Sequence, residues 1–198
     1  MESLIDYQKE IYLTRTDPDN YEAYYANEQC YKENREIQKI LLSELKPGGS
    51  ILDLGSGLGL GYELLGRPLN YIGLDISAKM VQKCCRRHNG VFLLGDAEEY
   101  VSCANYLDNV IALFSFNYMR PSLVDVIMSK LRGTFIMVHY NEPYRKNSGS
   151  AYRGLKELFD YWHSGDKKEL ASRLEAHNTK TFKLLGEDYF YVSVLQGR

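Results

Sequence analysis

Short apolar runs recur along the middle of the chain, separated by stretches that mix polar and apolar residues. The runs are nearly continuous rather than alternating, which is typical of strands in a parallel sheet covered on both faces. They predict strands at 50–55, 71–76, 91–96, 109–116 and 133–140.

Helical patterns fill intervals between these strands. Ser77 is placed to cap a helix over 78–88, which ends in basic residues just before Asn89 and Gly90. Residues 121–131 have the pattern of another helix. The alternation of strand and helix predicts an α/β fold with a doubly wound, Rossmann-like sheet.

The two ends of the chain depart from this alternation. Residues 19–46 carry apolar positions on one helical face, and Pro47 ends that pattern. Residues 148–176 contain two polar helical stretches, and 181–197 hold two strand-like runs that predict an antiparallel hairpin. The predicted architecture is therefore a mostly parallel, seven-stranded sheet with an antiparallel C-terminal hairpin and an N-terminal helical cap.

Length and composition favour a single domain over residues 1–198. The chain is 44% apolar and 25% charged, which are ordinary globular values and supply enough apolar surface for a core. Four parts are expected within the domain. They are a helical cap at 1–46, a core at 47–140, a helical cover at 141–178 and the terminal hairpin at 179–198.

Charge and cysteine content narrow the classes of function. The formal net charge is −2 and no long basic run is present, which disfavours nucleic-acid and anionic-membrane partners. No apolar run is long enough to span a bilayer, and the polar N-terminus does not resemble a secretory signal. The four cysteines form no Cys-x-x-Cys pair, so we expect reduced thiols, no metal site and a cytoplasmic location.

A glycine-rich turn follows the first predicted strand, in the stretch ILDLGSGLGLGYELLG at 51–66. The dinucleotide fingerprint Gly-x-Gly-x-x-Gly fails in both registers, because its third glycine would fall on Leu60 or Tyr62. A phosphate-binding P-loop fails as well, since no Gly-Lys-Ser/Thr follows. The pattern that is present consists of one acid and three glycines at alternate positions: Asp53, Gly55, Gly57 and Gly59.

This pattern resembles motif I of the class I S-adenosylmethionine-dependent methyltransferases. Asp75 and Asp96 follow Asp53 at the ends of the next two predicted strands. The resemblance implies that Asp75 accepts hydrogen bonds from the ribose hydroxyls and that Asp96 accepts from the adenine amino group. A carboxylate at Asp53 would favour the cationic groups of this cofactor, whereas it would oppose a pyrophosphate.

The resemblance also implies further contacts with S-adenosylmethionine. Ile76 and Ala97 would offer apolar contact and backbone hydrogen bonds to the ring, and the fourth strand would lie beside the methyl group. An aromatic N-terminal helix would close over the cofactor, although its tyrosines equally suit plain packing. The candidate cofactor-binding residues are Tyr25, Tyr31, Asp53, Gly55, Ser56, Gly57, Gly59, Asp75, Ile76, Met80, Asp96, Ala97 and Phe114.

Candidates for the acceptor side follow the fourth and fifth strands. His139 is a candidate base if the acceptor must lose a proton, and an ordinary hydrogen-bonded histidine at a strand end is the alternative. Tyr118 is the second candidate catalytic residue, placed to orient an acceptor. Candidate substrate-binding residues are Asn117, Tyr140, Tyr144 and Arg153.

The absence of certain motifs narrows the range of possible methyl acceptors. The fourth strand carries neither the Asn/Asp-Pro-Pro-aromatic motif of amino-methylating DNA enzymes nor a carboxylate suited to a magnesium site, and the paired glutamates of arginine methyltransferases are absent. The resemblance therefore implies metal-independent methyl transfer to a small molecule by in-line displacement, with S-adenosylhomocysteine as product. A non-catalytic S-adenosylmethionine-binding or regulatory protein is one alternative, and a nicotinamide-dependent oxidoreductase is another.

Overall fold

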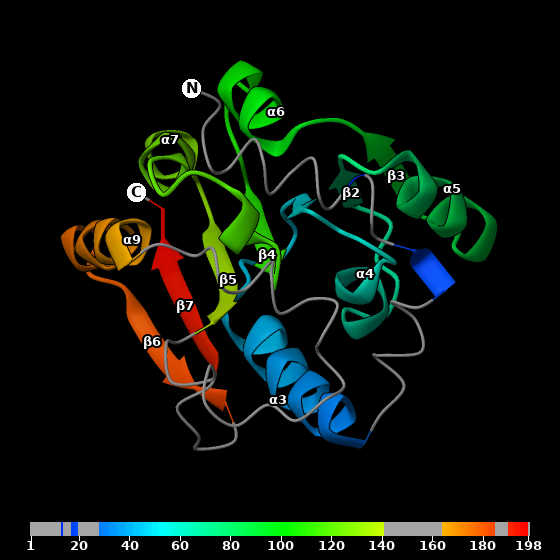
Figure 1. Ribbon diagram of the computed structural model, residues 1–198, viewed down its shortest axis with the longest axis horizontal. Helices are drawn as coiled ribbons and strands as arrows, with labels where there is room; N and C mark the ends of the chain where they lie inside the picture. Colours follow the sequence, from blue (N-terminus) through cyan, green and yellow to red (C-terminus); the bar gives the residue numbers. More distant parts are fainter. Residues whose placement is uncertain (1–12, 14–16, 20–27, 141–163, 185–189, 198) are drawn as a thin grey trace.

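A seven-stranded sheet runs through the centre of the protein (Figure 1). The computed structural model describes residues 13, 17–19, 28–140, 164–184 and 190–197. The strands lie in the order β3-β2-β1-β4-β5-β7-β6. Their bounds are β1 Ile51–Leu54, β2 Tyr71–Asp75, β3 Val91–Leu94, β4 Asn109–Leu113, β5 Thr134–Tyr140, β6 Lys180–Lys183 and β7 Phe190–Gln196.

The strand directions confirm the predicted mixed sheet. Strands β1 to β5 pair in parallel, whereas β7 is antiparallel to both β5 and β6. Because β1 lies between β2 and β4, the winding of the chain reverses at β1. Sheets of this kind bind ligands outside the carboxyl ends of the strands at such a switch point.

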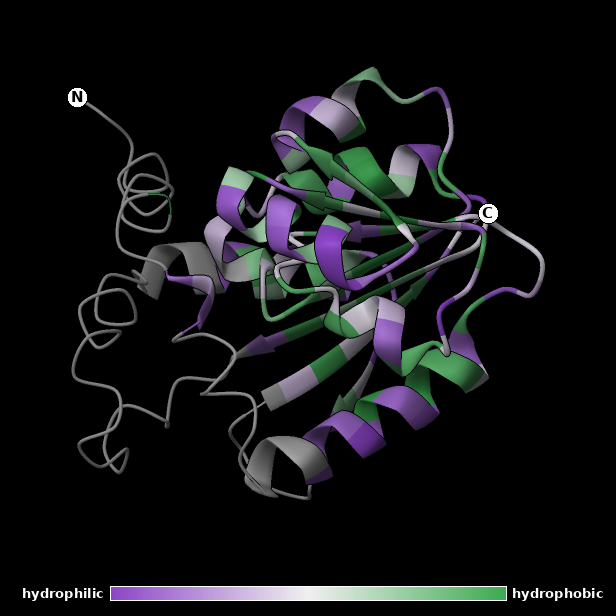
Figure 2. Cartoon of the chain, turned by 90° about the vertical axis from the view of Figure 1, so that its right-hand side faces the viewer, coloured by the Kyte–Doolittle hydropathy of each residue, from purple (hydrophilic) through white to green (hydrophobic). Residues whose placement is uncertain are grey.

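Helices cover both faces of the sheet and bury two separate apolar clusters against it. One face is covered by α6 (Ala97–Cys103), α7 (Leu123–Lys130) and α9 (Ser164–Ala176). The other face is covered by α3 (Glu28–Glu44), α4 (Leu60–Leu64) and α5 (Ala78–Arg87). Figure 2 shows hydrophobic strands between helices that carry hydrophilic residues on their outer sides. No helix in the described ranges is both long enough and apolar enough to cross a bilayer.

The predicted strands are confirmed with one instructive difference at β4. The apolar run predicted a strand to 116, but β4 ends at Leu113. Phe114 has a φ of 61°, in the left-handed region that bulky residues rarely adopt, and the backbone then enters a 3-10 turn, η1, at Phe116–Tyr118. This departure from strand geometry turns the chain across the end of the sheet.

The helices were predicted less completely than the strands. Ser77 caps α5 as expected, since its Oγ accepts from the backbone N–H of Met80 at 3.5 Å. Helix α6 was not predicted, because it has seven residues and buries Val101 alone among them, which is too little to produce a helical pattern of apolar positions. Within the predicted 19–46 helix, residues 28–44 form α3. The first of the two polar stretches at 148–176 lies mostly outside the described residues.

Asn109 connects three segments at the amino end of the sheet. Its side chain is 1% exposed. The amide oxygen accepts from the backbone N–H of Lys46 at 3.0 Å and of Thr134 at 3.2 Å, and the amide nitrogen donates to the Lys46 carbonyl at 2.9 Å. One side chain thus ties the entry to β1 to both β4 and β5.

We expect Asn109→Ala to lower the free energy of unfolding by about 2–4 kcal/mol, because it leaves buried backbone groups without partners. Urea denaturation of the whole chain measures this. Asn70→Ala is the matched control, since Asn70 also bonds a backbone carbonyl but is exposed, and its effect should stay within about 0.5 kcal/mol. Equal losses for the two variants would contradict the assignment.

Candidate functional site

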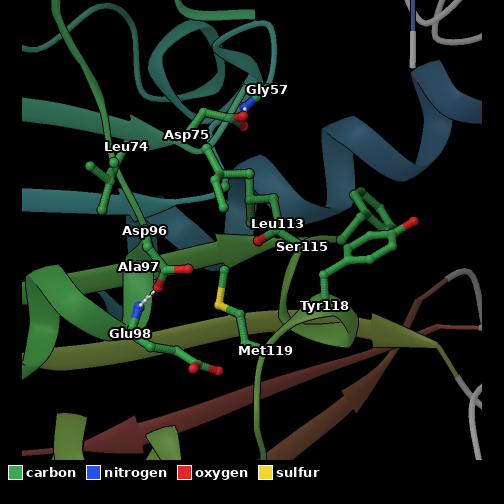
Figure 3. Close-up of a pocket in the computed structure, with 14 residues that line it drawn as sticks. Gly57, Leu74, Asp75, Asp96, Ala97, Glu98, Leu113, Ser115, Tyr118 and Met119 are labelled. Carbon is green, nitrogen blue, oxygen red and sulfur yellow. Dashed lines mark hydrogen bonds between the residues drawn. The ribbon is translucent and has the colours of Figure 1, made fainter. Parts of the chain in front are cut away.

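A pocket opens at the carboxyl ends of β1, β2, β3 and β4 (Figure 3). Its empty volume, including the mouth that opens to solvent, is about 640 Å³. The lining includes eight of the residues singled out in the sequence: Gly55, Gly57, Asp75, Ile76, Asp96, Ala97, Phe114 and Tyr118.

Six other lining residues were missed by the sequence reasoning. Ser115 and Met119 lie in the turn after β4, on either side of Tyr118, and this position after a strand end is the signal that could have identified them. Glu98 follows Asp96 by two residues and lies in the first turn of α6. The remaining three are Leu74, Gly95 and Leu113.

The glycine loop between β1 and α4 forms the floor of the pocket. Gly55, Gly57 and Gly59 all have positive φ values, of 69°, 52° and 80°. A side chain at Gly55 would overlap the Cβ of Ser115. The Ser115 hydroxyl donates to the Leu54 carbonyl, which holds the end of β4 directly against the loop. Glycine is therefore required here for both conformation and space.

Asp75 supports the same loop from β2. It is 2% exposed, and its carboxylate accepts from the backbone N–H of Gly57 and of Ser77, each at 2.8 Å. Figure 3 shows the carboxylate turned toward the Gly57 nitrogen. Asp75 therefore orders the glycine loop and the start of α5 while it lines the pocket, a second role that its place at a strand end did not reveal.

Asp96 and Glu98 form the wall on the side of β3. One oxygen of Asp96 accepts from the backbone N–H of Glu98 at 2.8 Å and of Glu99 at 3.3 Å, so Asp96 caps α6. Glu98 in turn accepts from the backbone N–H of Arg120 at 2.7 Å. This bond joins the first turn of α6 to the segment that precedes α7 and connects two sides of the pocket.

The charged residues of the lining are all acidic. They are Asp75, Asp96 and Glu98, and no Lys, Arg or His belongs to the described lining. Several other lining residues are apolar, including Leu74, Leu113 and Met119. A pocket with carboxylates and low-dielectric walls favours a cationic ligand and disfavours an anionic one. Among the described residues, no three His, Cys, Asp or Glu side chains gather as a metal site would require.

Asp53 lies on the other side of the sheet and does not line the pocket. It is 1% exposed beneath α4, where a Cβ on Gly61 would lie 2.5 Å from its carboxylate. The Tyr71 hydroxyl donates to this carboxylate, while the second oxygen has no hydrogen-bond partner among the described residues. Burial raises the pKa of Asp53 to about 7; the Tyr71 bond opposes that rise and the charge of Asp75 adds to it. The sequence placed this acid toward the ligand, and the structure places it in the core.

Other predicted residues also lie away from the pocket lining. Ser56 and Met80 are buried, and Gly59 precedes α4 against the ring of His88. A ring nitrogen of His139 is hydrogen-bonded to Ser193 Oγ at 2.9 Å, across the β5–β7 pair. None of these four residues belongs to the lining.

The remaining predicted residues fall outside what the structure describes. Tyr25, Tyr144 and Arg153 lie outside the described residues. For Tyr31, Asn117 and Tyr140 the backbone belongs to a described element, but the side chain is outside the description. Their predicted roles stay predictions.

The raised pKa of Asp53 predicts a pH-dependent stability. Between about pH 4 and pH 7 the folded protein retains a proton that the unfolded chain has released, so the free energy of unfolding falls as pH rises and levels off above about 7. Asp53→Asn removes this dependence. From pH 4 to pH 8 the variant should gain on the order of 3 kcal/mol relative to the unsubstituted protein in urea denaturation.

Asp108 provides a control of opposite sign. Hydrogen bonds from Ser50 lower the pKa of Asp108, so its contribution to stability is present above the unfolded pKa and is lost as pH falls. Asp108→Asn should therefore lose stability relative to the unsubstituted protein only as pH rises toward the unfolded pKa of 3.8, and the two profiles should run nearly parallel at higher pH. Parallel pH profiles for Asp53→Asn and the unsubstituted protein would show that folding does not raise the pKa of Asp53.

Comparison with known proteins relates this geometry to a family. Residues 51–133 match a family model described as a methyltransferase domain. A search of curated proteins finds no match.

Solved structures share the fold at low sequence identity. The plantazolicin methyltransferase BpumL in complex with SAH is 14% identical, with a TM-score of 0.68 over 96% of this chain and 94% of that one. Magnesium protoporphyrin IX methyltransferase (ChlM) from Synechocystis PCC 6803 with bound SAH is 13% identical, with a TM-score of 0.66 over 99% of this chain and 100% of that one. We conclude that residues 51–133 resemble a methyltransferase domain and that the chain has the Rossmann-like fold of these solved methyltransferases.

Proposed function

We propose that the pocket binds S-adenosylmethionine and that the protein transfers the methyl group to a small-molecule acceptor, leaving S-adenosylhomocysteine. The charge of the pocket lining is the observation that carries this proposal. Its three carboxylates suit a ligand that carries a sulfonium and an ammonium group, and the described lining contains no Lys, Arg or His. The Arg120 guanidinium, which is not part of this lining, lies 3.9 Å from Glu98. The same lining opposes the pyrophosphate of a nicotinamide dinucleotide, which was the other candidate for a sheet of this kind.

The residues around the pocket fit the nucleoside part of this cofactor. Asp75, at the end of β2, suits the ribose hydroxyls, and Asp96, at the end of β3, suits the adenine amino group. An ionised carboxylate offers about four acceptor positions, so the two backbone bonds of Asp75 do not exhaust its capacity. Ile76 and Ala97 add apolar contact beside the two acids.

The similar structures support the same ligand and the same class of acceptor. BpumL and ChlM were both solved with SAH bound, and BpumL also with a monoazolic desmethylPZN analog. The described pocket holds no basic side chain that would pair with a phosphate backbone, in agreement with a small acceptor rather than a nucleic acid.

The mechanism that we propose depends on positioning. The bound cofactor supplies a methyl group that its sulfonium already activates. The turn after β4 contributes Phe114, Tyr118 and Met119 to the pocket, where their apolar surfaces exclude water and align an acceptor for in-line displacement. No metal is assigned a role.

The proposal gives Tyr118 and His139 different roles. Tyr118 lines the pocket and would orient the acceptor. His139 lies outside the lining and is bonded to Ser193, so we assign it to positioning β5 against β7 rather than to proton transfer. An acceptor that needs no base fits this arrangement best.

Titration calorimetry with S-adenosylmethionine tests the binding. We expect a submillimolar dissociation constant, competition by S-adenosylhomocysteine and no competition by reduced nicotinamide dinucleotide. Absence of binding at submillimolar cofactor would refute the proposal. Incubation of the protein with labelled cofactor and pools of small-molecule acceptors then separates an enzyme, which transfers label, from a cofactor-binding protein, which does not.

We expect Asp75→Ala to weaken S-adenosylmethionine binding by about 1–3 kcal/mol, because the variant loses the ribose acceptor and the support of the glycine loop. Asp108→Ala is the control, since Asp108 lies at the opposite, amino end of the sheet beside Ser50 and should leave affinity unchanged. Equal affinity in both variants would show that Asp75 does not face the ribose.

A further inference from the structure

Two side chains from the α5 region contact the glycine loop in addition to Asp75. The Cys84 thiol donates to the carbonyl of Gly57 at 3.1 Å, and Nε2 of His88 lies 3.2 Å from the carbonyl of Leu58. Cys84 belongs to α5 and His88 is its C-terminal cap, four positions later. Residues with this spacing lie on one face of a helix, so the two side chains meet two consecutive carbonyls of the loop.

Both groups are buried and are held in place by their surroundings. Cys84 is 1% exposed and His88 is 6% exposed. The His88 ring packs near Tyr62 and Phe92, with ring centroids 5.5 and 5.7 Å away. A Cβ on Gly59 would lie 3.1 Å from the same ring. The imidazole therefore fills the space next to Gly59 of the loop.

The hydrogen bonds of His88 indicate its tautomer. The Leu58 carbonyl only accepts, so the bond requires the proton on Nε2. A neutral ring then carries a bare lone pair on Nδ1, and Nδ1 is buried with no hydrogen-bond partner among the described residues. The carboxylate of Glu63, 3.9 Å from Nε2, is the acidic group beside the ring, and Arg87 lies 3.8 Å from that carboxylate.

Fixing these two carbonyls also fixes the amide groups next to them. A trans peptide unit is planar and its C=O and N–H point in opposite directions. The Gly57 and Leu58 carbonyls therefore set the directions of the Leu58 and Gly59 N–H groups, and the Gly59 N–H donates to the Ser56 carbonyl at 2.8 Å. Because glycines with positive φ have many accessible conformations when unconstrained, a loop of this composition needs such restraints to keep one shape.

We propose that Cys84 and His88 are positioning residues that brace the glycine loop through hydrogen bonds to its carbonyl groups and preorganise it for the cofactor. Asp75 holds the Gly57 N–H, while Cys84 and His88 hold the two carbonyls that follow. The bracing restricts the conformation of the loop in the protein without ligand. The expected effect on cofactor affinity rests on the proposed function.

Substitutions in α5 and at its C-terminal cap separate the bracing hydrogen bonds from simple packing. His88→Phe keeps an aromatic ring against Tyr62 and Phe92 but removes the donor, whereas His88→Gln restores a donor near the position of Nε2. Cys84→Ala removes the thiol. Cys85→Ala is the matched control, because the neighbouring Cys85 is exposed and its sulfur lies 4.0 Å from the Phe92 carbonyl, outside the glycine loop.

Amide hydrogen exchange of the full chain without ligand tests the brace directly. We expect His88→Phe and Cys84→Ala to speed exchange in the segment 55–59 by about two- to tenfold, the range that corresponds to one net hydrogen bond. His88→Gln and Cys85→Ala should exchange like the unsubstituted protein. Unchanged exchange in His88→Phe, or faster exchange spread equally over β1 and β4, would overturn the proposal.

Calorimetry with S-adenosylhomocysteine adds the functional readout. We expect His88→Phe and Cys84→Ala to bind about two- to tenfold more weakly, with His88→Gln and Cys85→Ala close to the unsubstituted protein. If the unsubstituted chain does not bind, the proposed function fails while the exchange data still decide the brace. If it binds and His88→Phe binds equally well, the functional part of this inference is wrong.

Discussion

The reversal of the backbone after β1 is the constraint on which the rest of the site depends. The chain leaves β1 through three glycines with positive φ, and it passes so close to Ser115, just after β4, that no side chain fits at Gly55. Hydrogen bonds hold this path from several directions, since Asp75 binds the Gly57 amide and Cys84 binds the Gly57 carbonyl. These hydrogen bonds hold the glycine loop close to the ends of the strands, where it lines the pocket.

The contrast between Asp53 and Asp75 shows how the sheet assigns roles to chemically identical residues. Both lie in central parallel strands near their carboxyl ends. Asp75 ends its strand and accepts backbone bonds at the pocket, whereas Asp53 pairs with Gly73 in register and faces the α4 side, where Tyr71 reaches it. Burial there raises its pKa to about 7, a value far from that of a solvated carboxylate. One residue serves the pocket and the other is part of the core.

Much of the fold could be predicted because its signals are local. The apolar runs predicted β1, β2 and β5 within one or two residues, and the split run at the C-terminus predicted the antiparallel pair of β6 and β7. Local signals failed to predict the elements whose limits depend on tertiary contacts. The run through 109–116 continues past Leu113, yet the positive φ of Phe114 ends the strand there, and α6 has too few buried residues to show a helical period.

The sequence alone determined the order of the elements, the glycine turn and the acids at the ends of β1, β2 and β3, because each of these depends on residues close together in the chain. Only the tertiary structure decided which acids face the pocket, that His139 is bonded to Ser193, and that Cys84 and His88 reach the loop. The bonds of His139, Cys84 and His88 join residues about 27 to 54 positions apart. They form only after strand order and helix packing bring those residues together, and no local pattern of apolar and polar positions specifies such distances.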